Sequence, residues 1–399
     1  MCPLTWENNK DNLTERLQLA VRTNDNVQGF THNYYRYPAR FSPRFVREVI
    51  ELFSKPGDVI LDPFVGGGTT LVEAFASNRH SIGFDVSPIA FFVSQAKTTL
   101  LSEKDLEEVS MWAEFVLQKG IQGVESKITF YNADGYLNNL PWTIRKSIEV
   151  ILNDVELLKT KEQQRFAKCV LLKTAQWAID CRKNIPSTKD FRNKFSHNIK
   201  IFSNGIRELS ITISKIAHKT QPLCICLNRS SETLTDCQEL NLLPAKPKLV
   251  ITSPPYIGVH MLYHQWQVNS RKRTRAPFWI INSLDGQGSA FYTFGHYQSH
   301  AKKNYFEIAE NAFTSIHSAI DDEALVIQLV GFSNHKKFLG KYLEMMTTAG
   351  YEEVPITTDK LNRIQRIWRS VPNRKWYVTS KNHSSSKEVL LVHRKNKIK

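Results

Sequence analysis

Apolar and polar positions along this 399-residue chain follow two periods, one typical of strands and one of helices. Short apolar runs predict buried strands at about 58–62, 81–85, 223–227, 248–253, 324–330, 351–357 and 388–393. Apolar residues three and four positions apart predict helices at about 43–53, 69–77, 88–96, 305–320 and 335–349. Strands that alternate with helices in this order predict βαβ units, and therefore an α/β fold with a largely parallel sheet.

Two long stretches depart from this alternation. Residues 101–221 have helical spacing almost throughout, and we interpret them as a helical insertion within the sheet domain. Residues 257–304 are rich in aromatic side chains and have poor periodicity, which predicts a long functional loop region over the ligand crevice. The predicted division is therefore a core in two parts, 1–100 and 222–399, separated by the insertion.

Composition indicates an ordinary globular protein, with 41% hydrophobic and 11% aromatic residues. No apolar run approaches the roughly 20 residues that span a bilayer, and the first residues lack the layout of a signal peptide, so we expect a cytoplasmic protein with no membrane partner. The six cysteines are scattered, which predicts neither a zinc site nor a disulfide framework.

Net charge adds a candidate partner. The chain carries a formal charge of +15, and residues 360–399 hold twelve Lys and Arg against one acid, Glu388, a net +11. Trp368, Trp376 and Tyr377 lie among these arginines, a composition that suits phosphates and stacked bases. A solvated basic tail is the alternative, but nucleic acid is favoured.

Two motifs follow predicted strands. Asp62-Pro63-Phe64-Val65-Gly66-Gly67-Gly68-Thr69-Thr70 lacks the lysine of a phosphate-binding P-loop, which disfavours an NTPase. Asp85 ends the next strand roughly 20 residues later, where a ribose hydroxyl would need an acceptor. The second motif, Thr252-Ser253-Pro254-Pro255-Tyr256, is a rigid corner with an aromatic ring, which suits a flat substrate. If the two strands are neighbours in one parallel sheet, both motifs meet in one crevice.

Together the motifs resemble those of the S-adenosylmethionine-dependent amino-methyltransferases of DNA, the N4-cytosine/N6-adenine class. Tyr37-Pro38-Ala39-Arg40-Phe41 and Gly83-Phe84-Asp85-Val86-Ser87-Pro88 are similar to further segments of that family. The resemblance covers about 31–100 and 222–395. It implies a Rossmann-like class I methyltransferase fold with a mostly parallel seven-stranded sheet, a late antiparallel strand, and S-adenosylmethionine as cofactor.

The resemblance also implies a cofactor site. Asp62, Phe64, Gly66, Gly68 and Thr69 would surround the methionine and sulfonium part, and Asp85 would bind the ribose hydroxyls. The acidic position near the adenine is either in Asn132-Ala133-Asp134-Gly135 or at Ser231 and Glu232, which chain order favours. The full expected set is Tyr37, Ala39, Phe41, Asp62, Pro63, Phe64, Gly66, Gly68, Thr69, Thr70, Asp85, Ser87, Ser231, Glu232 and Thr252.

The expected catalytic residues are Ser253, Pro254, Pro255 and Tyr256. An exocyclic amino group is a poor nucleophile because its lone pair is delocalised into the ring. The Ser253 hydroxyl and the Pro254 carbonyl would accept hydrogen bonds from its two N–H groups and favour a pyramidal nitrogen. The two prolines would hold these acceptors in place. Tyr256 offers a face on which a flipped base can stack. The reaction would be direct transfer, without a covalent intermediate or a metal.

Ser in the first motif position is linked by the resemblance to cytosine N4, and Asp or Asn to adenine N6. We therefore predict a site-specific DNA (cytosine-N4) methyltransferase that acts on double-stranded DNA, in a restriction–modification setting that could include a cognate endonuclease. The alternatives are an N6-adenine enzyme, an RNA base methyltransferase and an inactive DNA-binding homologue. The expected DNA-binding residues are Arg271, Lys272, Arg273, Arg275, Arg363, Arg366, Arg369 and Arg374. Positions 363, 366 and 369 would share one face if that segment is helical.

Overall fold

The computed structural model describes residues 10–23, 27–37, 40–121, 135–216, 221–257, 265–269, 272–285, 291–295, 301–358, 364–370 and 387–396. The strands are β1 Val59–Asp62, β2 His80–Phe84, β3 Cys224–Leu227, β4 Leu249–Thr252, β5 Trp266–Val268, β6 Lys272–Thr274, β7 Leu325–Phe332, β8 Tyr351–Glu353, β9 Thr357–Thr358, β10 Ile364–Gln365, β11 Trp368–Ser370 and β12 Lys387–Lys395. The α-helices are α1 Lys10–Arg22, α2 Pro43–Phe53, α3 Thr69–Ala76, α4 Pro88–Thr98, α5 Glu103–Gln118, α7 Trp142–Asp154, α8 Lys161–Ile179, α9 Thr188–Ile216, α10 Ala276–Ile281, α11 Ala301–Ala319 and α12 His335–Thr348. Short 3₁₀ turns are η2 His32–Tyr34, η3 Val155–Leu157, η4 Ser231–Asp236, η5 Gln238–Leu242 and η6 Phe291–Thr293.

One sheet organises the molecule, with strand order β11-β12-β7-β4-β1-β2-β3. The five strands from β7 to β3 are parallel, whereas β12 runs antiparallel to β7. The Rossmann-like α/β fold and the late antiparallel strand predicted from the sequence are confirmed. Because β1 and β4 are direct neighbours, the residues that follow them lie side by side at one edge of the sheet.

The expected number of strands is wrong. Within the described residues the sheet has eight strands rather than seven, because two short strands share the edge beside the long strand β12. β8 pairs with the C-terminal part of β12, and β11 pairs with its N-terminal part. The expected helical face at 363, 366 and 369 is also corrected, since 364–365 and 368–370 are strands.

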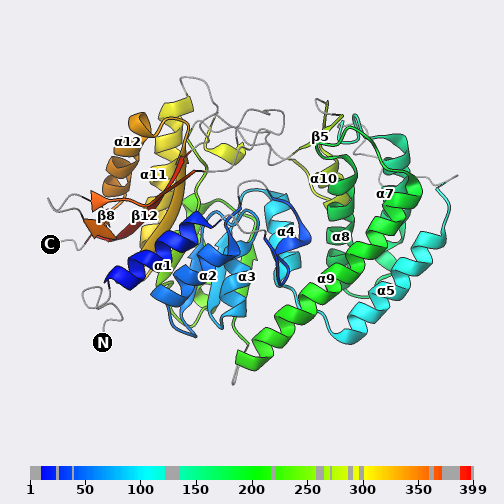
Figure 1. The fold of residues 1–399 in the computed structure, drawn as a ribbon, viewed down its shortest axis with the longest axis horizontal. Coiled ribbons are helices and arrows are strands. Elements are labelled where there is room, and N and C mark those ends of the chain that lie inside the picture. Colours follow the sequence, from blue (N-terminus) through cyan, green and yellow to red (C-terminus); the bar gives the residue numbers. More distant parts are fainter. Residues whose placement is uncertain are drawn as a thin grey trace.

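Successive side chains of a strand point to opposite faces of the sheet, and a hydrophobic core lies on each face. Val59 and Leu61 of β1 face a core shared with α11 and α12. Ile60 between them faces a core shared with α1 and α2. The ribbon shows α1, α2 and α3 covering one face of the sheet (Figure 1). All four residues of β1 are buried, as expected for a central parallel strand.

The helices between β2 and β3 form a separate layer beside the sheet. α5, α7, α8 and α9 pack around a core of their own, which also includes side chains of α4 and of residues 34–37 (Figure 1). The division of the chain into domains at 101 and 221 remains a prediction. Within the described residues, no helix is both long and apolar enough to cross a membrane.

The predicted loop region 257–304 contains regular structure in its middle. β5 and β6 form a hairpin, and α10 follows directly. Trp266, Val268 and the apolar residues of α10 are buried in the core of the helical layer, and the Cys181 amide donates to the Gln267 carbonyl at 2.8 Å. The expectation that this whole region covers the crevice is therefore corrected, because this hairpin and α10 pack on α8.

Candidate active site

A cavity of about 370 Å³ lies where β1, β2 and β4 end. This size is typical of small-molecule sites. It brings together the two sequence motifs, which are almost 190 residues apart in the chain. Its wall contains Tyr37, Arg40, Phe41, Pro63, Phe64, Val65, Gly66, Gly67, Thr69, Asp85, Val86, Ser87, Arg229, Ser230, Ser231, Glu232, Ser253, Pro254, Pro255, Tyr256, Phe291, Tyr292, Phe294, Gly295, Ile308 and Ala312.

The glycine loop between β1 and α3 is held by the end of β2. The Gly66 amide donates to Asp85 Oδ2 at 2.7 Å, and the Ser87 amide donates to Asp85 Oδ1 at 2.8 Å. Gly68 caps α3 in the left-handed region, with φ of 74°. A Cβ there would lie 2.7 Å from Ser94 Oγ, so only glycine fits both the backbone and the space.

Most of the expected cofactor residues line the cavity, but four lie behind its wall. Asp62, Gly68, Thr70 and Thr252 do not line it. Asp62 is 1% exposed, and it accepts hydrogen bonds from Thr252 Oγ1 at 2.9 Å and from the Phe64 amide at 3.2 Å. These contacts join the ends of β1 and β4, which explains why Asp62 faces the neighbouring strand rather than the cavity. Ala39 lies outside the described residues.

Two acidic side chains at this edge have unusual acidity. Burial raises the pKa of Asp62 to about 6, and burial likewise raises the pKa of Asp85 to about 6. Hydrogen bonds from the Phe64, Gly66 and Ser87 amides oppose these shifts in part. Asp85 is therefore a carboxylate at neutral pH that has lost much of its water and can accept hydrogen bonds from a ligand.

Two positions are candidates for the acidic residue near the adenine, and the structure describes Glu232 but not Asp134. Ser231 and Glu232 line the cavity at the start of η4, and Ser231 Oγ donates to the Pro63 carbonyl. Asp134 lies outside the described residues. Within the described part of the chain, Glu232 and Asp85 are thus the acidic residues in the cavity wall.

The Pro-Pro corner is anchored through its tyrosine. Ser253 Oγ donates to Tyr256 Oη at 3.0 Å, and Tyr256 Oη donates to Glu388 Oε1 of β12 at 2.7 Å. On the other side of the corner, Tyr305 Oη of α11 donates to the Pro255 carbonyl at 2.6 Å. Ser253, Pro254, Pro255 and Tyr256 all line the cavity, as the sequence predicts.

The sequence motifs did not identify several residues of the wall. Arg40 lies beside Gly67 in the cavity wall, and its guanidinium group donates to the His32 and Tyr35 carbonyls at 3.3 Å. Tyr292 and Phe294 come from the aromatic stretch after α10. Arg40 was visible in the Tyr-Pro-Ala-Arg-Phe segment, but no spacing rule assigned it to the ligand.

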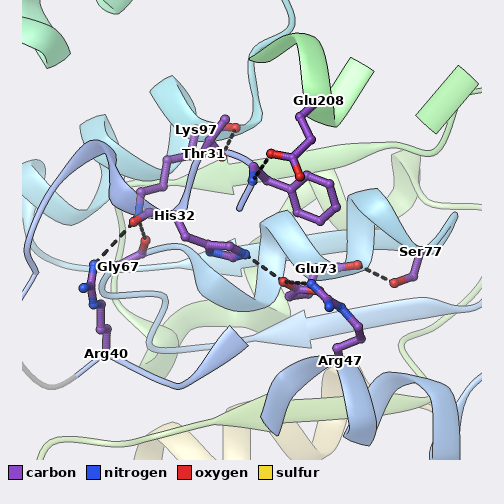
Figure 2. A network of polar contacts seen from close by, with 10 residues as sticks. Thr31, His32, Arg40, Arg47, Gly67, Glu73, Ser77, Lys97 and Glu208 are labelled. Atoms are coloured by element: carbon purple, nitrogen blue, oxygen red, sulfur yellow. Dashed lines mark hydrogen bonds and ion pairs between the residues drawn. The ribbon is translucent and has the colours of Figure 1, made fainter. Parts of the chain in front are cut away.

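A buried polar network lies next to the glycine loop and contacts it through Lys97 (Figure 2). Lys97 of α4 is fully buried, and its Nζ donates to the Gly67 carbonyl at 2.6 Å. Burial, together with the nearby Arg40, lowers the pKa of Lys97 to about 7. Next to it, Glu73 of α3 binds His32 at 2.7 Å and Arg47 at 2.9 Å. The loop therefore rests on charges and hydrogen bonds rather than on apolar packing alone.

The expected DNA-binding residues fall into three groups. Arg271, Arg363 and Arg374 lie outside the described residues. Lys272 and Arg273 are exposed on β6, and Arg275 lies over the Tyr136 ring at 4.4 Å. Arg366 forms an ion pair with Glu353 and Arg369 with Glu388, so the charges of these two are paired within the sheet.

Parts of the chain are similar to known DNA methylases. Residues 5–95 match the family model for DNA methylase of the N6/N4 class. The chain is 42% identical over 259 residues to the Type II methyltransferase M.BsoBI of Geobacillus stearothermophilus. This match covers 56% of this chain and 49% of that protein. It is 31% identical over 150 residues to the Type II methyltransferase M.MvaI of Kocuria varians, covering 35% and 32%. The matches thus span about half of these relatives or less.

A solved structure with a loose overall likeness is the rRNA methyltransferase AviRa from Streptomyces viridochromogenes. It is 11% identical, covers 90% of this chain and 89% of that one, and has a TM-score of 0.34, so the fold assignment rests on strand order instead. The sequence matches support an N6/N4-class DNA methylase domain in this chain, and with the fold they imply S-adenosylmethionine as its methyl donor.

Proposed function

We propose that this protein transfers a methyl group from S-adenosylmethionine to an exocyclic amino group in double-stranded DNA. The observation that carries the proposal is the shared cavity, which has the glycine loop and Asp85 in one wall and Ser253 to Tyr256 in another. A methyl donor in the first part would face an amino group held by the second. The partial sequence matches to Type II methyltransferases support the same reaction.

The residues of the cavity suit this cofactor. Asp85 is a partly desolvated carboxylate that would accept hydrogen bonds from the two ribose hydroxyls. Glu232 lies in the same wall, and Ser231 fixes its segment to the loop. Arg40 would bind the carboxylate of the methionine part, since it is a cation beside the glycine loop. The aromatic Phe64 and Tyr37 would enclose the remaining apolar surface.

When bound, the sulfonium group would supply an electrophilic methyl group to a neutral nitrogen, which would leave S-adenosylhomocysteine and release one amino proton to water. Ser253 would accept a hydrogen bond from the amino group of the base, and the Pro254 carbonyl would accept the second. These contacts favour a pyramidal nitrogen whose lone pair faces the methyl group. Tyr256 would stack on the base after it leaves the duplex.

Cytosine N4 is the base position we propose, because Ser occupies the first position of the Ser-Pro-Pro-Tyr motif. Adenine N6 is the second candidate, and it is supported by the matched model, which covers both types of enzyme. We further propose that the protein works in restriction–modification with a cognate endonuclease, because its relatives are named as Type II methyltransferases. The exposed Lys272 and Arg273 of β6 would contact phosphates.

Transfer of a tritiated methyl group tests the proposal. The protein is incubated with labelled S-adenosylmethionine and either double-stranded DNA of broad sequence content or mixed RNA. We expect label in DNA, none in RNA, and a loss of about 100-fold or more in Ser253→Ala, whose cofactor affinity should be unchanged. Label in RNA alone would indicate an RNA methyltransferase. Cofactor binding without transfer to either acid would favour the inactive homologue.

A further inference from the structure

A chain of hydrogen bonds leads from Ser253 into the sheet, and its far end has no role in the reaction described above. Ser253 Oγ donates to Tyr256 Oη at 3.0 Å, and Tyr256 Oη donates to Glu388 Oε1 at 2.7 Å. The other oxygen of Glu388 accepts from Arg369 at 2.5 Å. Four residues from two distant parts of the sequence thus form one continuous polar path from the cavity to β11.

The far end of this path is buried and fixed by the sheet. Glu388 of β12 is fully buried, and its cross-strand partners are Arg369 of β11 and Gly331 of β7. A Cβ at Gly331 would lie 2.5 Å from the Tyr256 ring, so the ring packs directly on that glycine. A buried carboxylate needs a charged partner, and Arg369 supplies one. The Tyr256 ring is thus held against Gly331, and Glu388 is held by its ion pair with Arg369.

The chemistry of the groups sets the direction of each hydrogen bond. A carboxylate only accepts, so the Tyr256 hydroxyl must give its proton to Glu388. The oxygen of Tyr256 then serves as an acceptor, and Ser253 gives its single proton to it. The lone pairs of Ser253 Oγ remain available to the cavity, whereas its proton points away from the substrate.

We propose that Glu388, held by Arg369, is a positioning residue that keeps the Ser253 hydroxyl an acceptor toward the amino group of the substrate base. The inference rests on the proposed methyl transfer and deepens it. If the Ser253 hydroxyl turned its proton toward the amino group of the base, two hydrogen-bond donors would face each other. The hydroxyl could then not accept the hydrogen bond from the amino group. Glu388 therefore acts on turnover, through Tyr256 and Ser253, and leaves the cofactor end of the cavity unchanged.

The test uses two variants of the full-length protein. Glu388→Gln keeps the shape of the side chain but offers an N–H group, which allows the chain of hydrogen bonds to reverse. Tyr256→Phe keeps the ring and removes the hydroxyl. We expect each to lower kcat by about 10-fold to 100-fold, with the KM for S-adenosylmethionine within about twofold of wild type. Because both act through one path, the double variant should be no slower than Tyr256→Phe alone.

Glu353→Gln is the matched control. Glu353 of β8 forms a two-bond ion pair with Arg366 at 2.7 Å and also pairs with β12, but its contacts do not reach the motif. This variant should keep wild-type kcat, and thermal unfolding of all variants checks that they fold. If Glu388→Gln does not fold, Tyr256→Phe alone decides.

Three results would overturn the inference. They are wild-type kcat in Tyr256→Phe, wild-type kcat in a folded Glu388→Gln, and losses in the two single variants that multiply in the double. If the wild-type protein itself transfers no methyl group to DNA, the proposed function fails first. An active wild type with unaffected variants would instead remove only the role of Glu388.

Discussion

Asp62 and Asp85, at the ends of β1 and β2, have pKa values of about 6 because burial disfavours their charged forms. Binding of the cofactor should therefore depend on pH. In the proposed site, ionised Asp85 would accept hydrogen bonds from the ribose hydroxyls, so cofactor affinity should be full above its pKa and fall about tenfold per pH unit well below it. Calorimetric titration between pH 5 and 8 measures this.

Asp85→Asn supplies the control for that titration. It should bind the cofactor more weakly at pH 7.5 and show a flatter pH dependence, because the amide does not titrate in this range. Constant affinity of the wild-type protein from pH 5 to 8 would contradict the role of Asp85. Uncomplexed protein should follow the opposite trend, since raised carboxyl pKa values add stability at low pH that is lost as the pH rises through about 6.

Glu73 carries a second prediction at this scale, on stability. It is fully buried and holds His32 and Arg47 beneath the glycine loop (Figure 2). Glu73→Ala should cost about 3 kcal/mol in the free energy of unfolding, because it leaves His32 and part of Arg47 without a partner. Urea denaturation measures the change. A loss below about 1 kcal/mol would show that the network contributes little.

At the scale of elements, two glycines inside helices should respond to alanine in opposite ways. In α9, a Cβ at Gly205 would lie 2.4 Å from the Phe30 carbonyl oxygen, so Gly205→Ala must push α9 away from the segment before η2. In α12, a Cβ at Gly340 would have no atom within 4 Å. We expect Gly205→Ala to lose about 1–3 kcal/mol and Gly340→Ala to gain about 0.5–1 kcal/mol. Melting temperatures that shift in the same direction would contradict this packing.

The elements also show what the sequence could predict. The buried strands of the sheet and the helices α3 and α4 follow from apolar period, and the start of α4 also follows from its capping residue Ser87, whose Oγ accepts from the Ala90 amide. β11 was missed because it has three residues and lies among arginines. The β5–β6 hairpin was missed because its burial comes from α8, which is distant in sequence.

Prediction of the site has a similar limit. The motifs placed Asp85 and Ser253 correctly in one cavity, since parallel neighbours end at the same edge. Glu388 looked like a lone acid in a basic segment, and its contact with Tyr256 spans 132 positions in the chain. Contacts of this kind depend on the pairing of β7 with β12, which no local pattern reveals.

The whole molecule carries a formal charge of +15, which predicts salt-dependent association with DNA. Arg273 is exposed on β6, which lies in sequence between the Ser253–Tyr256 corner and the cavity residues Phe291 to Gly295. Arg273→Ala should weaken DNA binding and reduce the slope of log affinity against log salt by about 1, the value for one lost phosphate contact. Lys55→Ala, at the exposed turn before β1, should leave the slope unchanged. Equal slopes in wild type and Arg273→Ala would remove Arg273 from the interface.

The proposed roles of Asp85 and Glu388 both depend on methyl transfer to an exocyclic amino group of DNA at the Ser253 corner. Its most direct test is mass spectrometry of nucleosides from DNA that has been incubated with the protein and methyl-deuterated S-adenosylmethionine. We expect deuterated N4-methylcytosine with wild type and none with Ser253→Ala. Deuterated N6-methyladenine alone would contradict the choice of base, and DNA without any deuterated methyl group would contradict the claim itself.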